Sequence, residues 1–238
     1  MRVATWNVEY AYARRLHALR QKLADNNADI WVLTETHDDL APPNCLYVAH
    51  SKPRPKNWAG IREGSRWVSI WSRYPILANV SLPGSDTERT TCALLDIGNG
   101  KTLLVYGTVI PWKGDRGKFD WSEHHRVIPD QCAEWLALKQ AYPNAELCVA
   151  GDFNTDMGTG RYYGTKVGIS ALRAGLKACD LFCATEPGRI PKGILAFPPI
   201  DHIALSLKRE HSTSIHAAWD AHRKMLSDHS GVIIETAE

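Results

Sequence analysis

The stretch from Leu147 to Asn154 constrains the fold most, because an apolar β-type run there ends in two polar side chains. Asp152 and Asn154 follow Gly151 closely. Side chains of an extended chain alternate between faces, so positions 152 and 154 point to one side and Phe153 to the other. A carboxylate and a carboxamide would then face one space, as in a catalytic or binding site. The alternative is a strand end capped by a turn, since Gly, Asp and Asn are also turn residues.

The first part of the chain predicts a β-α-β unit whose two strands also end in polar residues. A β-type run at 2–8 is followed by an amphipathic helix at 14–26 and a second strand at 29–34. The carboxyl ends of strands are where α/β sheets place their sites, so side chains at both ends can reach one ligand. The polar residues there are Asn7, Glu9 and Glu35.

The remainder of the chain alternates strand and helix patterns, and we find no linker, internal repeat or low-complexity segment. With 44% hydrophobic and 23% charged residues, the composition is that of an ordinary globular protein. We therefore expect one α/β domain over residues 1–238, built of sheets with covering helices. Strands are predicted at 45–49, 66–72, 75–82, 90–97, 101–110, 179–184, 200–207 and 231–234, and helices at 122–141 and 172–176.

Charge and hydropathy exclude few partners. The formal charge of +2 and the pI near 8.2 are too mild to indicate an anionic partner by themselves. No apolar run reaches the roughly 18 residues of a membrane span, and no apolar leader follows a basic start. We expect a cytoplasmic monomer that does not bind membranes.

Local charge is more informative, because one segment interleaves cations with tryptophans. Residues 52–73 carry six basic residues and one acidic residue, together with Trp58, Trp67 and Trp71. Cations and aromatic rings suit phosphate contacts and base stacking. The alternative is a solvated loop followed by a strand, and for Trp67 and Trp71 we favour a place in the core. The candidate substrate contacts here and in the later loop at 111–121 are Arg54, Lys56, Trp58, Arg62 and Trp112.

Five short motifs occur in order across nearly the whole chain. They are Trp6-Asn7-Val8-Glu9, Leu33-Thr34-Glu35-Thr36, Gly151-Asp152-Phe153-Asn154, Ile200-Asp201-His202-Ile203 and Ser227-Asp228-His229-Ser230. Together with Ser72-Arg73-Tyr74-Pro75-Ile76 they resemble the endonuclease/exonuclease/phosphatase superfamily, which includes DNase I, AP endonucleases and inositol-phosphate phosphatases. Any one motif is weak, but the ordered set is specific. The resemblance implies a DNase I-like fold, a four-layer sandwich of two mixed β-sheets flanked by helices.

The resemblance also implies a divalent metal. Hard cations prefer carboxylate and carboxamide oxygens, and the matched positions supply such a set. Mg²⁺ is the expected ion, with Mn²⁺ as the alternative. The implied metal ligands are Glu35, Asp228, Asn7 and Glu9.

The remaining matched residues imply the chemistry. Asp152 would orient or deprotonate the attacking water, and Asn154 would hold a phosphate oxygen. His229 would stabilise the developing charge, and Asp201 would fix its tautomer and favour its cationic form. Each residue taken separately could be an ordinary surface or turn residue, and only the joint match favours a site.

One position departs from the family pattern. Many relatives carry a histidine or tyrosine that contacts the phosphate on the strand matching 103–110, whereas this chain has Thr108 and Val109 there. Thr108 is our candidate for the replacement.

Three functions fit these residues. The first is a Mg²⁺-dependent nuclease that hydrolyses DNA or RNA phosphodiesters with an activated water, which the basic, Trp-containing loops favour. The second is a phosphatase or phosphodiesterase for a small or lipid-derived phosphoester, which the missing phosphate contact and the mild net charge favour. The third, a binding module without catalysis, is disfavoured because every matched metal, base and histidine position is filled.

Overall fold

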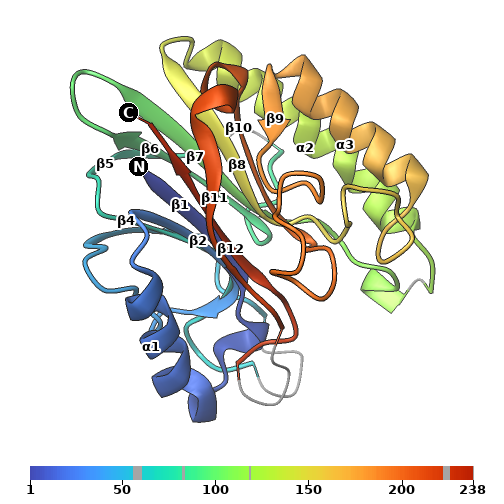
Figure 1. The fold of residues 1–238 in the computed structure, drawn as a ribbon, viewed down its shortest axis with the longest axis horizontal. Coiled ribbons are helices and arrows are strands. Elements are labelled where there is room, and N and C mark those ends of the chain that lie inside the picture. The colour runs from blue at the N-terminus through green and yellow to red at the C-terminus, as the bar shows by residue number, and fades with distance from the viewer. Residues whose placement is uncertain (56–60, 82–83, 118, 222–225, 238) are drawn as a thin grey trace.

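The computed structural model describes residues 1–55, 61–81, 84–117, 119–221 and 226–237, and these form two six-stranded mixed sheets (Figure 1). Strands β1 and β2 pair in parallel in one sheet, as do β7 and β8 in the other, and the remaining pairs are antiparallel. The first sheet has the order β11 (Thr213–Trp219), β12 (Gly231–Thr236), β1 (Arg2–Asn7), β2 (Ile30–His37), β4 (Ser65–Ser72) and β3 (Tyr47–His50). The second has the order β5 (Ile76–Val80), β6 (Thr90–Asp96), β7 (Thr102–Val109), β8 (Ala145–Asp152), β10 (Asp201–Ser206) and β9 (Leu181–Cys183).

Helices cover the outer faces of the two sheets. The sheets pack on each other through a core that includes Val32 and Ile70 from one and Val105 and Ile203 from the other. Helix α1 (Leu16–Asn26) buries Leu19 and Leu23 against the first sheet, whereas α2 (Ser122–Ala141) and α3 (Lys166–Ala178) cover the second (Figure 1). The predicted four-layer sandwich is therefore confirmed. No described helix is long and apolar enough to cross a membrane.

Most predicted elements are present, with two differences. Helix α2 has the predicted bounds, but α3 begins six residues before the predicted 172–176 and ends two residues after it. Strand β11 was not predicted, because its alternation Thr-Ser-Ile-His-Ala-Ala-Trp is weakly apolar and it lies at the edge of its sheet. The core positions predicted for Trp67 and Trp71 are confirmed, at 7% and 8% exposure.

The polar strand ends converge because strands from both sheets finish at one end of the sandwich. In the second sheet, Asp152 at the end of β8 lies directly opposite Asp201 at the start of β10. Gly151 has φ +133°, and a Cβ there would lie 2.1 Å from the carbonyl oxygen of Thr108. Only glycine fits this close approach of β7 and β8. The approach places Asp152 at the rim of the sheet.

Candidate active site

A cavity of about 300 Å³ lies where these strand ends meet. Most of its lining residues belong to the motifs noted in the sequence, and three aromatic residues add to them. The lining residues are Glu9, Tyr10, Glu35, Trp112, Asp152, Asn154, Tyr163, Asp228 and His229. The structure thus gathers residues that are up to 220 positions apart in the chain around one space.

Asn7 connects residues of the two sheets across the cavity through hydrogen bonds. Its Nδ2 donates to Glu35 Oε1 at 3.3 Å and to Asp152 Oδ2 at 3.1 Å. Its Oδ1 accepts the backbone N–H of Glu9 at 2.9 Å. Because the side chain is buried and both amide hydrogens are used, it fixes the carboxylate of the first sheet beside that of the second.

Asp201 and His229 form a hydrogen-bonded pair beside Asp152. His229 Nδ1 lies 2.6 Å from Asp201 Oδ2, and the Asp201 side chain is fully buried. Burial opposes the charge of His229, but the carboxylates of Asp201, Asp152 and Asp228 outweigh it and raise the pKa of His229 to about 10. The pair therefore holds an imidazolium in the cavity at neutral pH.

Asp152 and Asn154 are fixed by local bonds at the end of β8. Asp152 Oδ1 accepts the backbone N–H of Asn154, and Asn154 Nδ2 donates to the carbonyl of Ile110, both at 2.9 Å. Burial raises the pKa of Asp152 to about 8, with Asp201 adding to the effect and His229 opposing it. General bases at catalytic sites commonly have a pKa near neutrality.

Backbone strain concentrates at this cavity. Glu35 and Asn154 have φ of 47° and 49°, in the left-handed region that non-glycine residues rarely adopt. Such conformations cost about 1–3 kcal/mol each and persist only where the surroundings enforce them. Both strained residues carry predicted roles in the site.

The donor set fits a divalent cation. Burial raises the pKa of Glu35 as well as that of Asp152, and the Arg54 guanidinium only partly opposes this for Glu35. The positive charge near these carboxylates is therefore too small to offset their burial. Ligand atoms of Asp152, Asp201 and His229 lie within 4.8 Å of one another, close enough to hold a metal. An imidazolium cannot coordinate a metal, so the oxygen donors of Glu35, Asp228 and Asn7 are the better set.

Glu9 lies at the edge of the cavity, but its charge is already paired. Arg15 donates from Nη1 to Glu9 Oε2 and from Nη2 to the Glu9 carbonyl, each at 2.6 Å. Arg15 thus competes with a cation for Glu9 Oε2, and the role of Glu9 as a metal ligand stays a prediction. Glu9 also fixes a turn, Glu9–Ala11, that directs Tyr10 into the cavity.

Tyr163 is a cavity residue that the sequence did not indicate. The Asp156 carboxylate accepts four backbone N–H groups of the loop that carries Tyr163 and thereby fixes that loop. Burial, together with the charge of Asp152, raises the pKa of Tyr163 to about 12. Its hydroxyl is therefore protonated and able to donate a hydrogen bond in the cavity.

Thr108 does not reach the cavity, and its prediction as a phosphate contact was wrong. It is fully buried, and its Oγ1 donates to Gln131 Oε1 of α2 at 2.9 Å. Thr108 shares the helix-covered face of β7 with Leu104 and Tyr106, because side chains two apart point the same way.

The structure describes some of the predicted substrate contacts in the basic loop and in the later loop. Arg54 is buried beside the cavity, whereas Trp112 lines it. Arg62 donates to Asp39 Oδ2 at 3.0 Å and to the Ala11 carbonyl at 3.1 Å, so it helps to fix the turn, and its role as a substrate contact stays a prediction. Lys56 and Trp58 lie outside the described residues.

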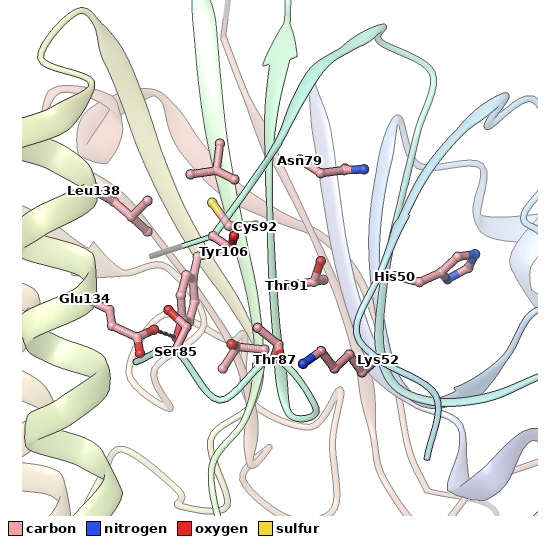
Figure 2. A pocket seen from close by; sticks show the side chains of 13 residues that line it. His50, Lys52, Asn79, Ser85, Thr87, Thr91, Cys92, Tyr106, Glu134 and Leu138 are labelled. Carbon is pink, nitrogen blue, oxygen red and sulfur yellow. Dashed lines mark hydrogen bonds between the residues drawn. The ribbon is translucent and has the colours of Figure 1, made fainter. Parts of the chain in front are cut away.

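A separate hollow lies between β6, the loop before it and α2 (Figure 2). Hydroxyl side chains such as Thr87 and Thr91 line it, with Lys52 beside them. Its single carboxylate, from Glu134, accepts the Tyr106 hydroxyl at 2.6 Å (Figure 2). None of the motif residues lines this hollow, so it is not the predicted site.

Comparisons with known proteins agree with the fold and the motifs. The model of the Endonuclease/Exonuclease/phosphatase family matches residues 4–229. The 3′ phosphatase NExo from Neisseria, solved with product DNA hairpin, is similar with a TM-score of 0.69, 18% identity and full coverage of both chains. No curated protein matches the chain in sequence.

Two further solved structures share the fold. The endonuclease domain of TRAS1, a telomere-specific non-LTR retrotransposon, has a TM-score of 0.65, 13% identity and coverage of 100% of this chain and 98% of its own. Sphingomyelinase C from Streptomyces griseocarneus has a TM-score of 0.63, 16% identity and coverage of 100% and 99%. These likenesses show a DNase I-like fold, and the family model spans nearly the whole sequence. The chain therefore belongs to the endonuclease/exonuclease/phosphatase family of phosphoesterases.

Proposed function

We propose that this protein is a divalent-cation-dependent phosphodiesterase that acts on nucleic acid. The observation that carries the proposal is the arrangement of a buried base, Asp152, next to the Asp201–His229 pair in one cavity. A group that can take a proton and a group that holds positive charge are the two requirements for water attack on a phosphate ester.

Each group has a defined task in this reaction. Asp152, held by Asn7 and Asn154, accepts the proton of the attacking water. The imidazolium of His229, oriented by Asp201, stabilises negative charge on the phosphate oxygens. The Tyr163 hydroxyl donates a hydrogen bond to the phosphate, the task that Thr108 cannot perform.

A divalent cation would be held by Glu35, Asp228 and Asn7. When bound, it supplies charge that neutralises phosphate oxygens and compensates the surrounding carboxylates. An all-oxygen donor set is the kind that Mg²⁺ prefers, and Mn²⁺ can use the same ligands.

Aromatic rings favour a nucleic-acid substrate. Tyr10, Trp112 and Tyr163 all line the cavity, and base–aromatic stacking is a common source of affinity for single strands. The similarity to NExo and to the TRAS1 endonuclease domain supports the same substrate class.

A small or lipid-derived phosphoester is the second candidate. Near the cavity, Arg62 is paired with Asp39 and Arg66 with Asp38, which reduces the positive charge available to a long polyanion. The similarity to sphingomyelinase C supports this alternative.

A substrate panel separates the two functions. The wild-type protein is assayed with Mg²⁺ on single-stranded DNA, a 3′-phosphorylated DNA hairpin, RNA, sphingomyelin vesicles and bis(p-nitrophenyl) phosphate, and again with EDTA. We expect EDTA-sensitive cleavage of a nucleic acid with kcat/KM well above that for the other esters. Preferred hydrolysis of sphingomyelin or the nitrophenyl ester would replace the nuclease assignment with the second candidate.

Replacing Glu35 with Gln is expected to raise the Mg²⁺ concentration for half-maximal activity by about 10-fold or more, because the carboxamide keeps the shape but loses the charge. The measurement is a Mg²⁺ titration of initial rates. The exposed Glu88→Gln substitution is the matched control. An unchanged titration for Glu35→Gln would remove Glu35 from the metal site.

A further inference from the structure

Arg54 is a buried cation at the boundary of the candidate active site. Its guanidinium is stacked between two rings, with Cζ 3.5 Å from the centre of Trp67 and 4.7 Å from that of Tyr10. The side chain is only 2% exposed. Tyr10 on one side of Arg54 lines the catalytic cavity, so the guanidinium forms part of the wall behind it.

The charge of Arg54 is only partly compensated within the part of the chain that the structure describes, by a long ion pair with Glu35 and a hydrogen bond with Tyr10. Its Nε and Nη1 atoms are buried and find no hydrogen-bond acceptor among those residues. The nearest carboxylate oxygen paired with it is Glu35 Oε2, at 4.0 Å from Nη1. Buried guanidinium donors without acceptors are costly, so their retention indicates an anion that arrives from outside.

Neighbouring arginines differ from Arg54 in this respect. Arg89 also lies over Trp67, with Cζ 4.7 Å from the ring centre, but it forms a hydrogen bond at 3.0 Å and a close ion pair at 2.9 Å with Asp115. Arg66 donates to both carboxylate oxygens of Asp38. Arg54 therefore has donors available for an external anion, whereas Arg66 and Arg89 pair closely with carboxylates of the protein.

The turn that places Tyr10 on Arg54 is strained. Glu9, Tyr10 and Ala11 have φ of 44°, 64° and 43°, three successive non-glycine residues in the left-handed region. Arg15 and Arg62 hold this turn through Glu9 and the Ala11 carbonyl. Strain that the surroundings enforce at this position keeps the ring against the guanidinium.

Arg54 faces a second hollow beside the catalytic cavity. That hollow is lined by Arg54, Arg62 and Arg66 with the segment 63–65, by 37–39 and by Pro53. Arg54 lines this hollow but not the catalytic cavity, whereas Glu35 and Tyr10 line the catalytic cavity. An anion bound by Arg54 is therefore a second group, distinct from the phosphate under attack.

We propose that Arg54 binds the phosphate adjacent to the scissile one, so that the substrate is a chain of at least two phosphodiesters. This inference rests on the proposed function and narrows it to a polynucleotide. A phosphocholine headgroup fits less well, because its quaternary ammonium would meet a guanidinium whose charge is only partly compensated. A monoester would leave the charge of Arg54 unused.

The test couples a protein substitution to a substrate substitution. A DNA oligonucleotide that the wild-type protein cleaves is prepared as a series, each with one phosphate near the cleavage point replaced by a neutral methylphosphonate. We expect one replacement, adjacent to the scissile phosphate, to lower kcat/KM about 10- to 100-fold, the effect of losing a charge-assisted hydrogen bond. Arg54→Gln should cause a similar loss on the unmodified DNA, and the two changes together should cost little more than either alone.

The matched control is Arg66→Gln, in the same hollow but paired with Asp38. Its effect and that of the methylphosphonate should multiply as independent changes. Binding of the same series to the Asp152→Asn variant, measured by fluorescence anisotropy, should show the same single sensitive phosphate. Arg54→Lys, which keeps the charge, should recover part of the loss if Arg54→Gln folds poorly.

Independent effects of Arg54→Gln and every methylphosphonate would overturn the inference while leaving the nuclease assignment intact. A wild-type scan without any sensitive neighbouring phosphate would do the same without relying on a variant. If the wild type hydrolyses only bis(p-nitrophenyl) phosphate or sphingomyelin, the proposed function fails first and the inference with it.

Discussion

Replacing Asp152 with Asn is expected to lower turnover by about 10²- to 10⁴-fold while substrate binding is retained. The amide has the size of the carboxylate but cannot accept a proton. Asp152 is 2% exposed and accepts hydrogen bonds from Asn154 N–H and Asn7 Nδ2, so the substitution disturbs one of these contacts.

Single-turnover rates and anisotropy binding to a nucleic-acid substrate measure the two parts of this prediction. Denaturant unfolding checks that the variant is folded. Asp180→Asn, on the exposed pair with Lys139, is the matched control and should keep full turnover. Loss of binding together with turnover would assign Asp152 a structural role instead of a catalytic one.

The acid limb of the pH–rate profile should depend on the cation. Because burial raises the pKa of Asp152 to about 8, the base is mostly protonated at pH 7 without a bound metal. A cation held beside it favours the ionised form and lowers this pKa. Profiles at low and saturating Mg²⁺ should therefore differ, with the acid limb at lower pH when the metal site is filled.

The fold was largely predictable because its strands and longest helix show clear periodicity. The exceptions have tertiary causes. Helix α3 contains two glycines, Gly168 and Gly175, and the helix predicted from the sequence left out the turn that carries Gly168, because glycine has a low helix propensity. In the structure a Cβ at Gly175 would lie 2.1 Å from Cys132 Sγ, and one at Gly168 would lie 2.8 Å from His124 Nε2. These glycines allow α2 and α3 to pack closely, which local propensity cannot indicate.

The sequence predicted the site residues that lie at the ends of strands, but not those that reach the site from loops. Asn7, Glu35, Asp152 and His229 meet as expected, because the strand ends meet. Tyr10 and Tyr163 depend on a strained turn and on the Asp156-bound loop, which carry no periodic signal. For Thr108, the alternation of β7 directs the side chain to α2, so its position on the expected strand was not sufficient.

Replacing Asp201 with Asn is expected to move both limbs of the pH–rate profile to lower pH. Against the effect of burial, Asp201 makes the largest of the contributions that raise the pKa of His229 to about 10, so its loss lets this pKa fall toward the ordinary value near 6.5, and the alkaline limb follows. Asp201 also raises the pKa of Asp152, so its loss moves the acid limb to lower pH as well. At pH 8–9 the variant lacks the imidazolium charge, and kcat should fall about 10²- to 10³-fold, as when a charge-stabilising donor is removed.

The profile separates this role from a structural one, because unfolding or loosening lowers activity at all pH values without moving both limbs together. The measurement is kcat/KM from pH 5 to 10.5 at saturating Mg²⁺, with ¹⁵N NMR titration of His229 as an independent readout. His229→Gln is the companion variant, since it removes the alkaline limb altogether and should leave Asp201→Asn with only its shift of the acid limb in the double variant. An Asp201→Asn profile that is lower but unshifted, with an unchanged His229 titration, would show that the carboxylate at 2.6 Å from Nδ1 does not set the charge of the histidine.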